Sequence, residues 1–268
     1  MTVSRRNFLE AGSAALVAAR IGRAQNRIQP EFEIGSVRAL VFDVFGTVVD
    51  WRTSVSLEVE QLAKRKGLMI DGAKFADDWR RQYPTSMNRV RTGELPWTKL
   101  DRLHRMILDQ VLKDFAISGL SEAETDSLNR AWHRLRPWPD AVRGLTRLKK
   151  KFIIAPLSNG NISLMTDMAK HSQLPWDCIL GAELVRHYKP DREVYQSAAE
   201  FLDLKLAEVM MVAAHLSDLR AAKAVGLRTA FVARPREFGP NGKPGLKADS
   251  SVDIEAKDFN ELATRLGA

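Results

Sequence analysis

The chain has 268 residues, 45% of them apolar, and a formal net charge of +8. A chain of this length and apolar content can bury a full hydrophobic core, which excludes a largely disordered protein. No long run of Lys and Arg indicates a nucleic-acid groove, so we expect no nucleic-acid partner. The single cysteine, Cys178, cannot form an internal disulfide, and we expect it to be buried in the core.

The N-terminal residues 1–24 have the features of an export signal. Two arginines, Arg5 and Arg6, precede Phe8, Leu9 and a weakly apolar stretch that ends near Ala24. This pattern resembles a bacterial twin-arginine signal peptide, so we expect export to the periplasm and cleavage after Ala24. The alternative is a basic amphipathic helix that belongs to the fold. The stretch is too short and too interrupted for a membrane span.

Strands and helices alternate through residues 25–51 and 137–268. Apolar runs predict strands at Val37–Val44, Phe152–Leu157, Cys178–Leu180, Val209–Ala214 and Arg228–Val232. Helical patterns cover Ile162–His171, Arg192–Leu202 and Leu216–Val225, and Val252–Leu266 predicts a final strand and helix. Pro235–Gly245 is expected to be a surface loop. The alternation predicts an α/β fold with a doubly wound parallel sheet.

Residues 52–136 show only helical patterns. The predicted helices are Ser54–Lys66, Gly72–Arg91 with a kink at Pro84, Pro96–Lys113 and Ser121–Arg134. An all-helical stretch of this length is too long for a crossover between two strands. We interpret it as an inserted helical cap domain over the carboxyl edge of the sheet, where α/β sheets bind their ligands.

Polar residues follow the strands at the points where the strands are predicted to end. They are Asp43 and Thr47 after the first strand, Ser158 and Asn159 after the second, Lys189 after the third, and His215 and Asp218 after the fourth. Each of these alone has a structural explanation, such as a helix cap or a turn. Their occurrence at four successive strand ends predicts one site at the carboxyl edge of the sheet.

The segments FDVFGTVVDW, LSNGN, YKPDREVY and VAAHLSDL carry a resemblance to a known family. They resemble the haloacid dehalogenase superfamily, in particular its type II branch, the (S)-2-haloacid dehalogenases. The resemblance covers nearly all of the chain after residues 1–24, including the position of a helical cap. It implies a HAD-like Rossmannoid core that converts short 2-haloalkanoic acids to 2-hydroxy acids with inversion. The implied partners are a small 2-haloacid and a halide ion, and a homodimer is left open.

Phe45 distinguishes this chain from the phosphatases of the superfamily, which carry a second aspartate at that position. Phosphoryl transfer needs a metal ion to neutralise phosphate charge and an acid to protonate the leaving alkoxide. A halide is weakly basic and needs no proton donor. An aromatic side chain at position 45 removes a metal ligand and the acid together, and it repels an anionic substrate less. Phe45 therefore favours a dehalogenase with no metal and no cofactor.

The resemblance assigns roles in the chemistry to residues at the strand ends. Asp43, ionised at neutral pH, would attack the α-carbon and form an aspartyl ester that water then hydrolyses. Lys189 would pair with Asp43 and keep it charged. Asp218 would hold Lys189 or the hydrolytic water, and Thr47 would bond Asp43 or orient the water.

The resemblance also implies a set of substrate contacts. Ser158, with nearby backbone amides, would hold the substrate carboxylate, and Asn159 would help to cradle the departing halide. Arg80 on an early cap helix would be the main cationic partner of the halide, with Arg81 as the competing choice. Tyr195 would orient the substrate or its neighbours.

His215 is the departure from the family pattern, which has Ser-x-Asn-x-x-Asp where this chain has Ala213-Ala214-His215-Leu216-Ser217-Asp218. An imidazole with an ordinary pKa near 6.5 could serve as the base for ester hydrolysis or contact the halide or carboxylate. The alternative is a hydrogen-bonded structural histidine. The substitution leaves the substrate range open, including whether fluoroacetate is accepted.

Three other functions remain open at this stage. One is a magnesium-dependent phosphatase of the same fold, which Phe45 disfavours. Another is an enzyme that opens a small strained ring, such as azetidine-2-carboxylate, through the same aspartyl ester. The third is an exported, non-catalytic binder of small carboxylates.

Overall fold

The computed structural model describes residues 34–242, 245 and 247–268, and the predicted signal peptide, residues 1–24, lies outside them. All the described residues belong to one compact unit. None of the helices within these residues is long and apolar enough to cross a lipid bilayer.

Six parallel strands form the central sheet, in the order β5-β4-β1-β6-β7-β8. Their bounds are Ala39–Phe42 (β1), Ile153–Ser158 (β4), Leu180–Gly181 (β5), Val209–Ala213 (β6), Arg228–Val232 (β7) and Ile254–Ala256 (β8). Ala39 of β1 lies opposite Ile153 on one side and Val209 on the other. The predicted doubly wound parallel sheet is therefore confirmed. Because β1 is central, its carboxyl end lies where the chain turns from one half of the sheet to the other, which is where such sheets form a crevice.

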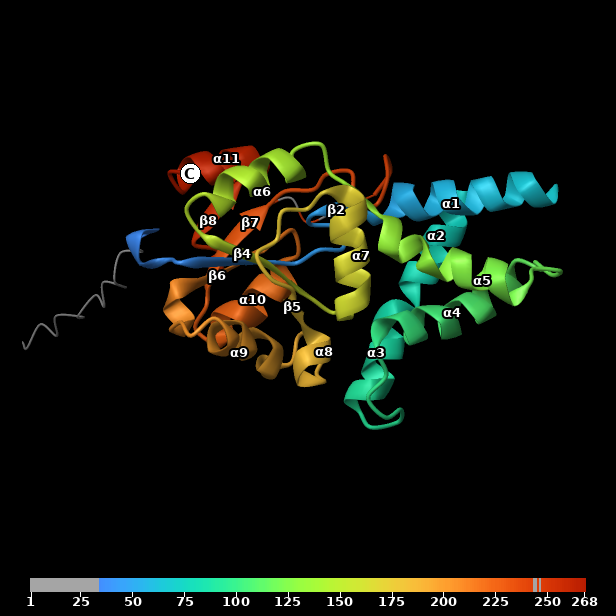
Figure 1. The fold of residues 1–268 in the computed structure, drawn as a ribbon, viewed down its shortest axis with the longest axis horizontal. Coiled ribbons are helices and arrows are strands. Elements are labelled where there is room, and N and C mark those ends of the chain that lie inside the picture. The colour runs from blue at the N-terminus through green and yellow to red at the C-terminus, as the bar shows by residue number, and fades with distance from the viewer. Residues whose placement is uncertain (1–33, 243–244, 246) are drawn as a thin grey trace, which may run out of the picture. The chain divides into compact units, whose positions relative to one another are not determined.

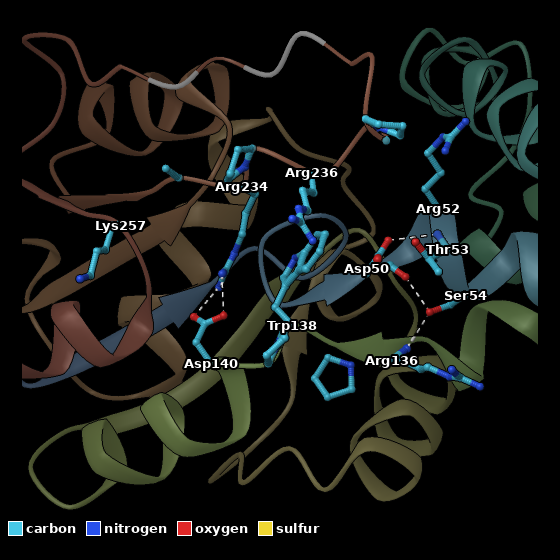
Figure 2. Close-up of a pocket in the computed structure, with 16 residues that line it drawn as sticks. Asp50, Arg52, Thr53, Ser54, Arg136, Trp138, Asp140, Arg234, Arg236 and Lys257 are labelled. Atoms are coloured by element: carbon cyan, nitrogen blue, oxygen red, sulfur yellow. Dashed lines mark hydrogen bonds and ion pairs between the residues drawn. The ribbon is translucent and has the colours of Figure 1, made fainter.

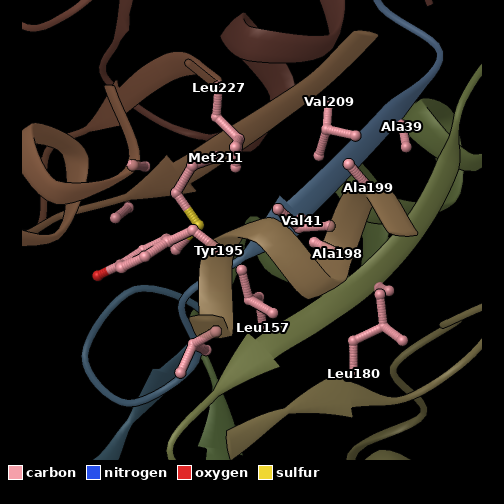
Figure 3. Close-up of a cluster of buried hydrophobic side chains, with 14 of the residues drawn as sticks. Ala39, Val41, Leu157, Leu180, Tyr195, Ala198, Ala199, Val209, Met211 and Leu227 are labelled. Atoms are coloured by element: carbon pink, nitrogen blue, oxygen red, sulfur yellow. The ribbon is translucent and has the colours of Figure 1, made fainter. Parts of the chain in front are cut away.

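Helices cover both faces of the sheet (Figure 1). Helices α6 (Ala141–Lys149) and α11 (Phe259–Arg265) pack together on one face, and α9 (Arg192–Phe201) and α10 (Leu216–Ala224) lie on the other. Val41 of β1 belongs to the apolar cluster under α9 and α10 (Figure 3), whereas the neighbouring Phe42 meets Phe259 of α11 edge to face at 5.6 Å between ring centroids. Burial on both faces explains why β1 is a continuous apolar run.

The stretch between β1 and β4 is helical. Its helices are α1 (Trp51–Lys66), α2 (Gly72–Arg81), α3 (Tyr83–Arg91), α4 (Leu100–Asp114) and α5 (Glu122–Asn129), followed by the 3₁₀ turn η2 (Arg130–Arg134). A short antiparallel pair, β2 (Val49–Asp50) and β3 (Arg136–Pro137), holds the two ends of this stretch together. The boundary between core and cap at residues 51–52 and 136–137 stays a prediction.

The structure differs from the sequence prediction at several elements. The sequence predicts one helix over Gly72–Arg91 with a kink at Pro84, whereas the structure has two helices: α2 ends at Arg81 and α3 starts at Tyr83, with Pro84 in its first turn. Proline suits a first turn because its missing N–H would have no helical acceptor there. Helix α6, the short helix α8 (Ala182–Val185) and the β2–β3 pair were not predicted. The helix predicted over Ile162–His171 is present as α7, with bounds Ile162–Ser172.

Cys178 also differs from its prediction. Its side chain is half-buried rather than fully buried, and it packs against the edge of the apolar cluster beneath α9. Burial still raises the pKa of its thiol.

Candidate active site

The strand ends bring most of the predicted residues to one pocket of about 260 Å³. The lining residues are Asp43, Phe45, Arg80, Tyr83, Asn159, Lys189, Pro190, Tyr195, His215, Ser217 and Asp218. Of the residues predicted for the site, only Thr47 and Ser158 are missing from this lining, and both are fully buried.

Asp43 follows β1 directly, and its backbone N–H extends the ladder by donating to the Val212 carbonyl at 3.0 Å. Its Oδ2 accepts from the Thr47 hydroxyl at 2.7 Å and from His215 Nδ1 at 3.1 Å, and Lys189 Nζ lies 3.5 Å from Oδ1. Burial alone would raise the pKa of Asp43, but Lys189, His215 and Thr47 outweigh it and hold that pKa well below the ordinary value. Asp43 is therefore a carboxylate at neutral pH.

Thr47 fixes the orientation of Asp43. Its hydroxyl donates to Asp43 and accepts from the backbone N–H of Ala214 at 2.9 Å, so it ties the loop after β1 to the end of β6. Gly46 lies between Phe45 and Thr47 with a φ of +88°, a region that glycine adopts at little cost.

Lys189 and Asp218 form a buried ion pair beside Asp43. Lys189 Nζ lies 2.7 Å from Asp218 Oδ2, and the Tyr195 hydroxyl donates to Asp218 Oδ1 at 2.6 Å. Burial would lower the pKa of Lys189, but the charges of Asp218 and Asp43 raise it above its ordinary value. Burial and the charge of Asp43 raise the pKa of Asp218, although Lys189 acts in the opposite direction. Two carboxylates thus share one ammonium group.

His215 supplies a second cation. It is the N-terminal cap residue of α10, but its ring contacts two carboxylates instead of the helix: Nδ1 lies 3.1 Å from Asp43 Oδ2, and Nε2 lies 3.0 Å from both carboxylate oxygens of Glu237. Burial would lower the pKa of His215, but its bonds to Asp43 and Glu237 raise that pKa to about 10. An imidazolium has no lone pair to take a proton, so His215 cannot act as a base while both carboxylates are charged.

Sequence reasoning misses Glu237. This residue lies in the predicted surface loop Pro235–Gly245. The prediction is wrong for Glu237, because its side chain is buried and the residue is 2% exposed. Its neighbours Pro235 and Arg236 are exposed, as predicted. The available signal was its position after the carboxyl end of β7, the next strand along the edge on which the other site residues lie. The four strand ends that the sequence predicts to form the site all precede β7 in the chain.

Phe45 lies against an aromatic cluster contributed by the cap helices. Its ring, 2% exposed, meets Tyr83, His104 and Trp132 edge to face at centroid distances of 6.5, 6.4 and 5.8 Å. Edge-to-face contacts at such distances stabilise aromatic clusters. The wall of the pocket at position 45 is therefore apolar.

Arg80 carries the positive charge on the cap side of the pocket. Its guanidinium lies 4.1 Å from the Tyr83 ring centroid, and its Nη1 is buried without a hydrogen-bond partner among the described residues. Arg81 instead lies at the surface and pairs with Asp78 at 2.6 Å. The sequence offers both arginines as candidates for the cationic residue of the pocket, and Arg80 is the one that lines it.

Ser158 and Asn159 hold the loop that faces Lys189. The Ser158 hydroxyl accepts from the Gly160 N–H at 3.0 Å, and Asn159 Oδ1 accepts from the backbone N–H of Lys189 at 2.8 Å. The amide nitrogen of Asn159 points to the Met87 sulfur at 3.3 Å. Their roles in binding carboxylate and halide stay predictions.

The residues around Asp43 do not fit a magnesium site of the phosphatase kind. The position two residues after Asp43 holds a phenylalanine, and the Asp43 oxygens face an ammonium and an imidazole instead of further oxygen ligands. Within residues 34–242, 245 and 247–268, no three His, Cys, Asp or Glu side chains are grouped so as to hold a metal ion.

A second cavity, of about 750 Å³, shares no lining residue with this pocket. Figure 2 shows its wall, in which Arg234 binds both oxygens of Asp140 and Trp138 lies between Arg234 and Arg136. The cavity is larger but is lined by none of Asp43, Lys189, His215 and Asp218. The chemistry therefore belongs to the smaller pocket.

Comparison with known proteins gives consistent matches. The signature of a hydrolase family described as haloacid dehalogenase-like hydrolase matches residues 37–226. The chain is 32% identical over 212 residues to (S)-2-haloacid dehalogenase 1 of Pseudomonas sp. (strain CBS-3), covering 75% of this chain and 88% of the relative.

Solved structures agree with these matches. The fold superposes on a defluorinating L-2-haloacid dehalogenase with a TM-score of 0.85 and 49% identity, covering 87% of this chain and 96% of that one. A second L-2-haloacid dehalogenase gives a TM-score of 0.82 and 46% identity, over 86% of this chain and 99% of that one.

Proposed function

Because the chain belongs to the haloacid dehalogenase-like hydrolase family, we propose that it hydrolyses short (S)-2-haloalkanoic acids to 2-hydroxy acids with inversion. One observation carries the proposal: Asp43 is an ionised carboxylate in contact with Lys189 and His215, and its neighbour in the pocket is the aromatic ring of Phe45. This arrangement supplies a nucleophile but no acid at the position where a phosphatase needs one.

The reaction has two steps. An Asp43 oxygen attacks the α-carbon from the side opposite the halogen, the new C–O bond forms as the C–halogen bond breaks, and halide leaves with the bonding electrons. Water then attacks the Asp43 carbonyl carbon, which regenerates the carboxylate and releases the 2-hydroxy acid. Lys189 and His215 offset the charge of Asp43 and of the substrate carboxylate before the first step.

Arg80 is suited to receive the halide. Its Nη1 is buried, lacks a hydrogen-bond partner among the described residues, and belongs to a side chain that lines the pocket. A leaving anion would satisfy this donor, so the developing charge would be stabilised where it appears.

The test is chloride release from (S)-2-chloropropionate by the full chain, with and without EDTA, beside an Asp43→Asn variant. We expect chloride release that survives EDTA and a variant that is at least about 10⁴-fold slower, because it lacks the nucleophile. Mg²⁺-dependent hydrolysis of a phosphate ester without chloride release would overturn the proposal.

Fluorinated acids are a second candidate substrate class. The solved relative at 49% identity is described as defluorinating, and fluoride requires strong hydrogen-bond donors, of which the pocket offers Arg80 Nη1. Fluoride release from fluoroacetate, measured with a fluoride electrode, tests this extension. Chloride release without fluoride release would limit the enzyme to the heavier halogens.

Export through the twin-arginine pathway to the periplasm is also part of the proposal. It rests on Arg5 and Arg6 and the small residues before Ala24, all outside the described residues. Replacing both arginines with lysine should leave the protein in the cytoplasm, and N-terminal sequencing of periplasmic protein would locate the cleavage site. Light scattering of the purified chain tests the homodimer that the family resemblance leaves open.

A further inference from the structure

Glu237 and His215 form a buried pair behind the nucleophile. The Glu237 side chain is 3% exposed, and both of its oxygens lie 3.0 Å from His215 Nε2. The other ring nitrogen of His215 lies 3.1 Å from Asp43 Oδ2. A carboxylate can only accept hydrogen bonds, so a ring bonded to one at each nitrogen needs a hydrogen on both nitrogens. The geometry is that of an imidazolium between two carboxylates.

The loop that carries Glu237 is fixed in place. Arg234, which is 6% exposed, donates to the Thr47 carbonyl at 2.8 Å and to both oxygens of Asp140 (Figure 2). The backbone N–H of Glu237 then closes a turn onto the Arg234 carbonyl at 3.2 Å. Trp51 Nε1 lies 3.3 Å from Glu237 Oε1. The carboxylate is thereby held against the loop that contains the nucleophile.

Gly46 leaves the space that this carboxylate occupies. A Cβ at position 46 would lie 2.1 Å from Glu237 Oε1, closer than any non-bonded contact allows. Glu237 and the loop after β1 therefore pack as one unit, with the carboxylate in the place of a side chain at residue 46.

The two oxygens of Asp43 are not equivalent. Oδ2 accepts from both Thr47 and His215, whereas the closest charged partner of Oδ1 is Lys189 Nζ at 3.5 Å. The oxygen with fewer bonds keeps its lone pairs available for attack on the α-carbon. Oδ2 then becomes the carbonyl oxygen of the ester, with two donors already directed at it, as an oxyanion hole requires.

Resting on the proposed dehalogenase function, we propose that Glu237 is a positioning residue that keeps His215 as an imidazolium, so that His215 Nδ1 and the Thr47 hydroxyl stabilise the oxyanion formed on Asp43 Oδ2 during ester hydrolysis. In that step the water oxygen bonds to Asp43 Cγ and the Cγ–Oδ1 bond breaks. One water proton ends on the hydroxyl of the product, and the other leaves to solvent as Asp43 regains its charge. Glu237 does not touch the substrate.

The proposed role of Glu237 affects the two chemical steps to different extents. Alkylation of Asp43 consumes negative charge on the carboxylate, whereas hydrolysis creates negative charge on Oδ2. A weaker donor at Oδ2 should therefore slow hydrolysis more than alkylation, and the ester should accumulate. A residue needed only for folding would lower both rates together with the amount of folded protein.

The first experiment is a single-turnover reaction of the full chain with (S)-2-chloropropionate, quenched in acid. Chloride, lactate and the mass of the Asp43 peptide are measured for wild type, Glu237→Gln, and Glu255→Gln as a matched control on the exposed face of the edge strand β8. In Glu237→Gln we expect lactate formation to slow by about 10- to 100-fold, below the loss for deleting a donor itself. Chloride release should change by less than about 3-fold, with accumulated ester, and the control should behave as wild type.

The second experiment does not depend on activity. The ¹⁵N shifts of the His215 ring, assigned with His215→Asn, report its charge directly in wild type and Glu237→Gln. The other charged groups that line its pocket are Asp43, Arg80, Lys189 and Asp218, and they are the same in both proteins. We expect an imidazolium at pH 8 in wild type and a midpoint at least about one pH unit lower in the variant, a tenfold change in proton affinity.

These measurements separate two kinds of failure. A neutral His215 ring at pH 7 in wild type, or equal slowing of chloride and lactate in Glu237→Gln, would overturn the role of Glu237. If wild type releases no halide and forms no ester, the dehalogenase function itself fails, while the ¹⁵N shifts still show whether Glu237 controls the charge of His215.

Discussion

Two histidines in different regions of the molecule show how surroundings decide charge. His104, in the aromatic cluster of the cap, is 1% exposed, stacks on Trp132 at 4.4 Å between centroids, and has no hydrogen-bond partner among the described residues at either ring nitrogen. Burial lowers its pKa to about 3. His215, at the strand ends of the core, binds a carboxylate at each nitrogen, and its pKa is raised to about 10. Burial alone makes an imidazole neutral, and two buried carboxylates keep it charged.

The pocket around Asp43 has an uncharged side and a charged side. On one side, the rings of Phe45 and Tyr83, both in contact with His104, form an uncharged wall. On the other side, Asp43, Asp218, Lys189 and His215 alternate in charge at hydrogen-bond or ion-pair distance. A substrate with a charged carboxylate and an apolar carbon–halogen end would match this division.

The largest expected effect comes from removing the cation shared by the two carboxylates of the charged region. Lys189→Met leaves Asp43 and Asp218 facing each other in a buried site, because Lys189 is 9% exposed and contacts both. We expect a loss of about 3–5 kcal/mol in the free energy of unfolding and at least about 10³-fold in kcat/KM. Urea unfolding and steady-state assays measure the two. A fully active and stable variant would show that Lys189 is dispensable.

The next largest effect concerns His215. His215→Phe removes one of two donors to Asp43 Oδ2, so we expect kcat to fall by about 10²- to 10³-fold.

Wild type should also lose stability as pH rises from about 6.5 toward 10, because the raised pKa of folded His215 contributes stability that is lost above the pKa of the unfolded chain. The loss should be less than about 1.4 kcal/mol per pH unit, since the side chain is 29% exposed. A variant with the same pH slope as wild type would contradict this assignment.

Arg80, which lines the pocket, and its neighbour Arg81, which lies at the surface, provide a matched pair of charges. Arg80→Gln removes the buried guanidinium that lines the pocket, and we expect kcat/KM to fall by about 10- to 100-fold, from loss of a charge-assisted hydrogen bond to the anion. Arg81→Gln removes an exposed ion pair with Asp78 and should change activity by less than about 2-fold. Equal losses in the two variants would remove the case for a halide contact at Arg80.

The smallest expected effect on activity is that of His104→Phe. Because the folded-state pKa of His104 is lowered to about 3, wild type should lose stability as pH falls below about 6.5, the opposite direction to His215. We expect the variant to escape this loss, with an advantage of about 2 kcal/mol at pH 5 relative to pH 8. Denaturation at the two pH values measures it. Unchanged acid sensitivity would mean that His104 is not the group that titrates.

Periodicity and turn residues are sufficient to predict the sheet and the strand-end residues, because parallel strands bring their carboxyl ends to one edge. Asp43, Lys189, His215 and Asp218 could be grouped on that basis, and they do meet in one pocket. The two-residue strands β2 and β3 were missed because so short a pair has no period to detect.

Glu237 and His104 could not be assigned from local sequence for a different reason. The environment of each depends on partners far along the chain: Glu237 meets Trp51 and His215, and His104 meets Trp132 and Phe45. Nothing in the residues adjacent to Glu237 separates a buried carboxylate from a solvated one.

Trp51, the first residue of α1, limits how the helical segment between β1 and β4 can be exchanged for that of a relative. Its ring stacks on Trp132 at 6.2 Å between centroids, and its indole nitrogen faces Glu237, whose carboxylate contacts His215. The helical segment is thus connected through its first residue to Glu237 and His215, and His215 contacts Asp43. A cap transplanted from a relative would have to bring a compatible residue at this junction, so the two parts of the chain are not interchangeable modules.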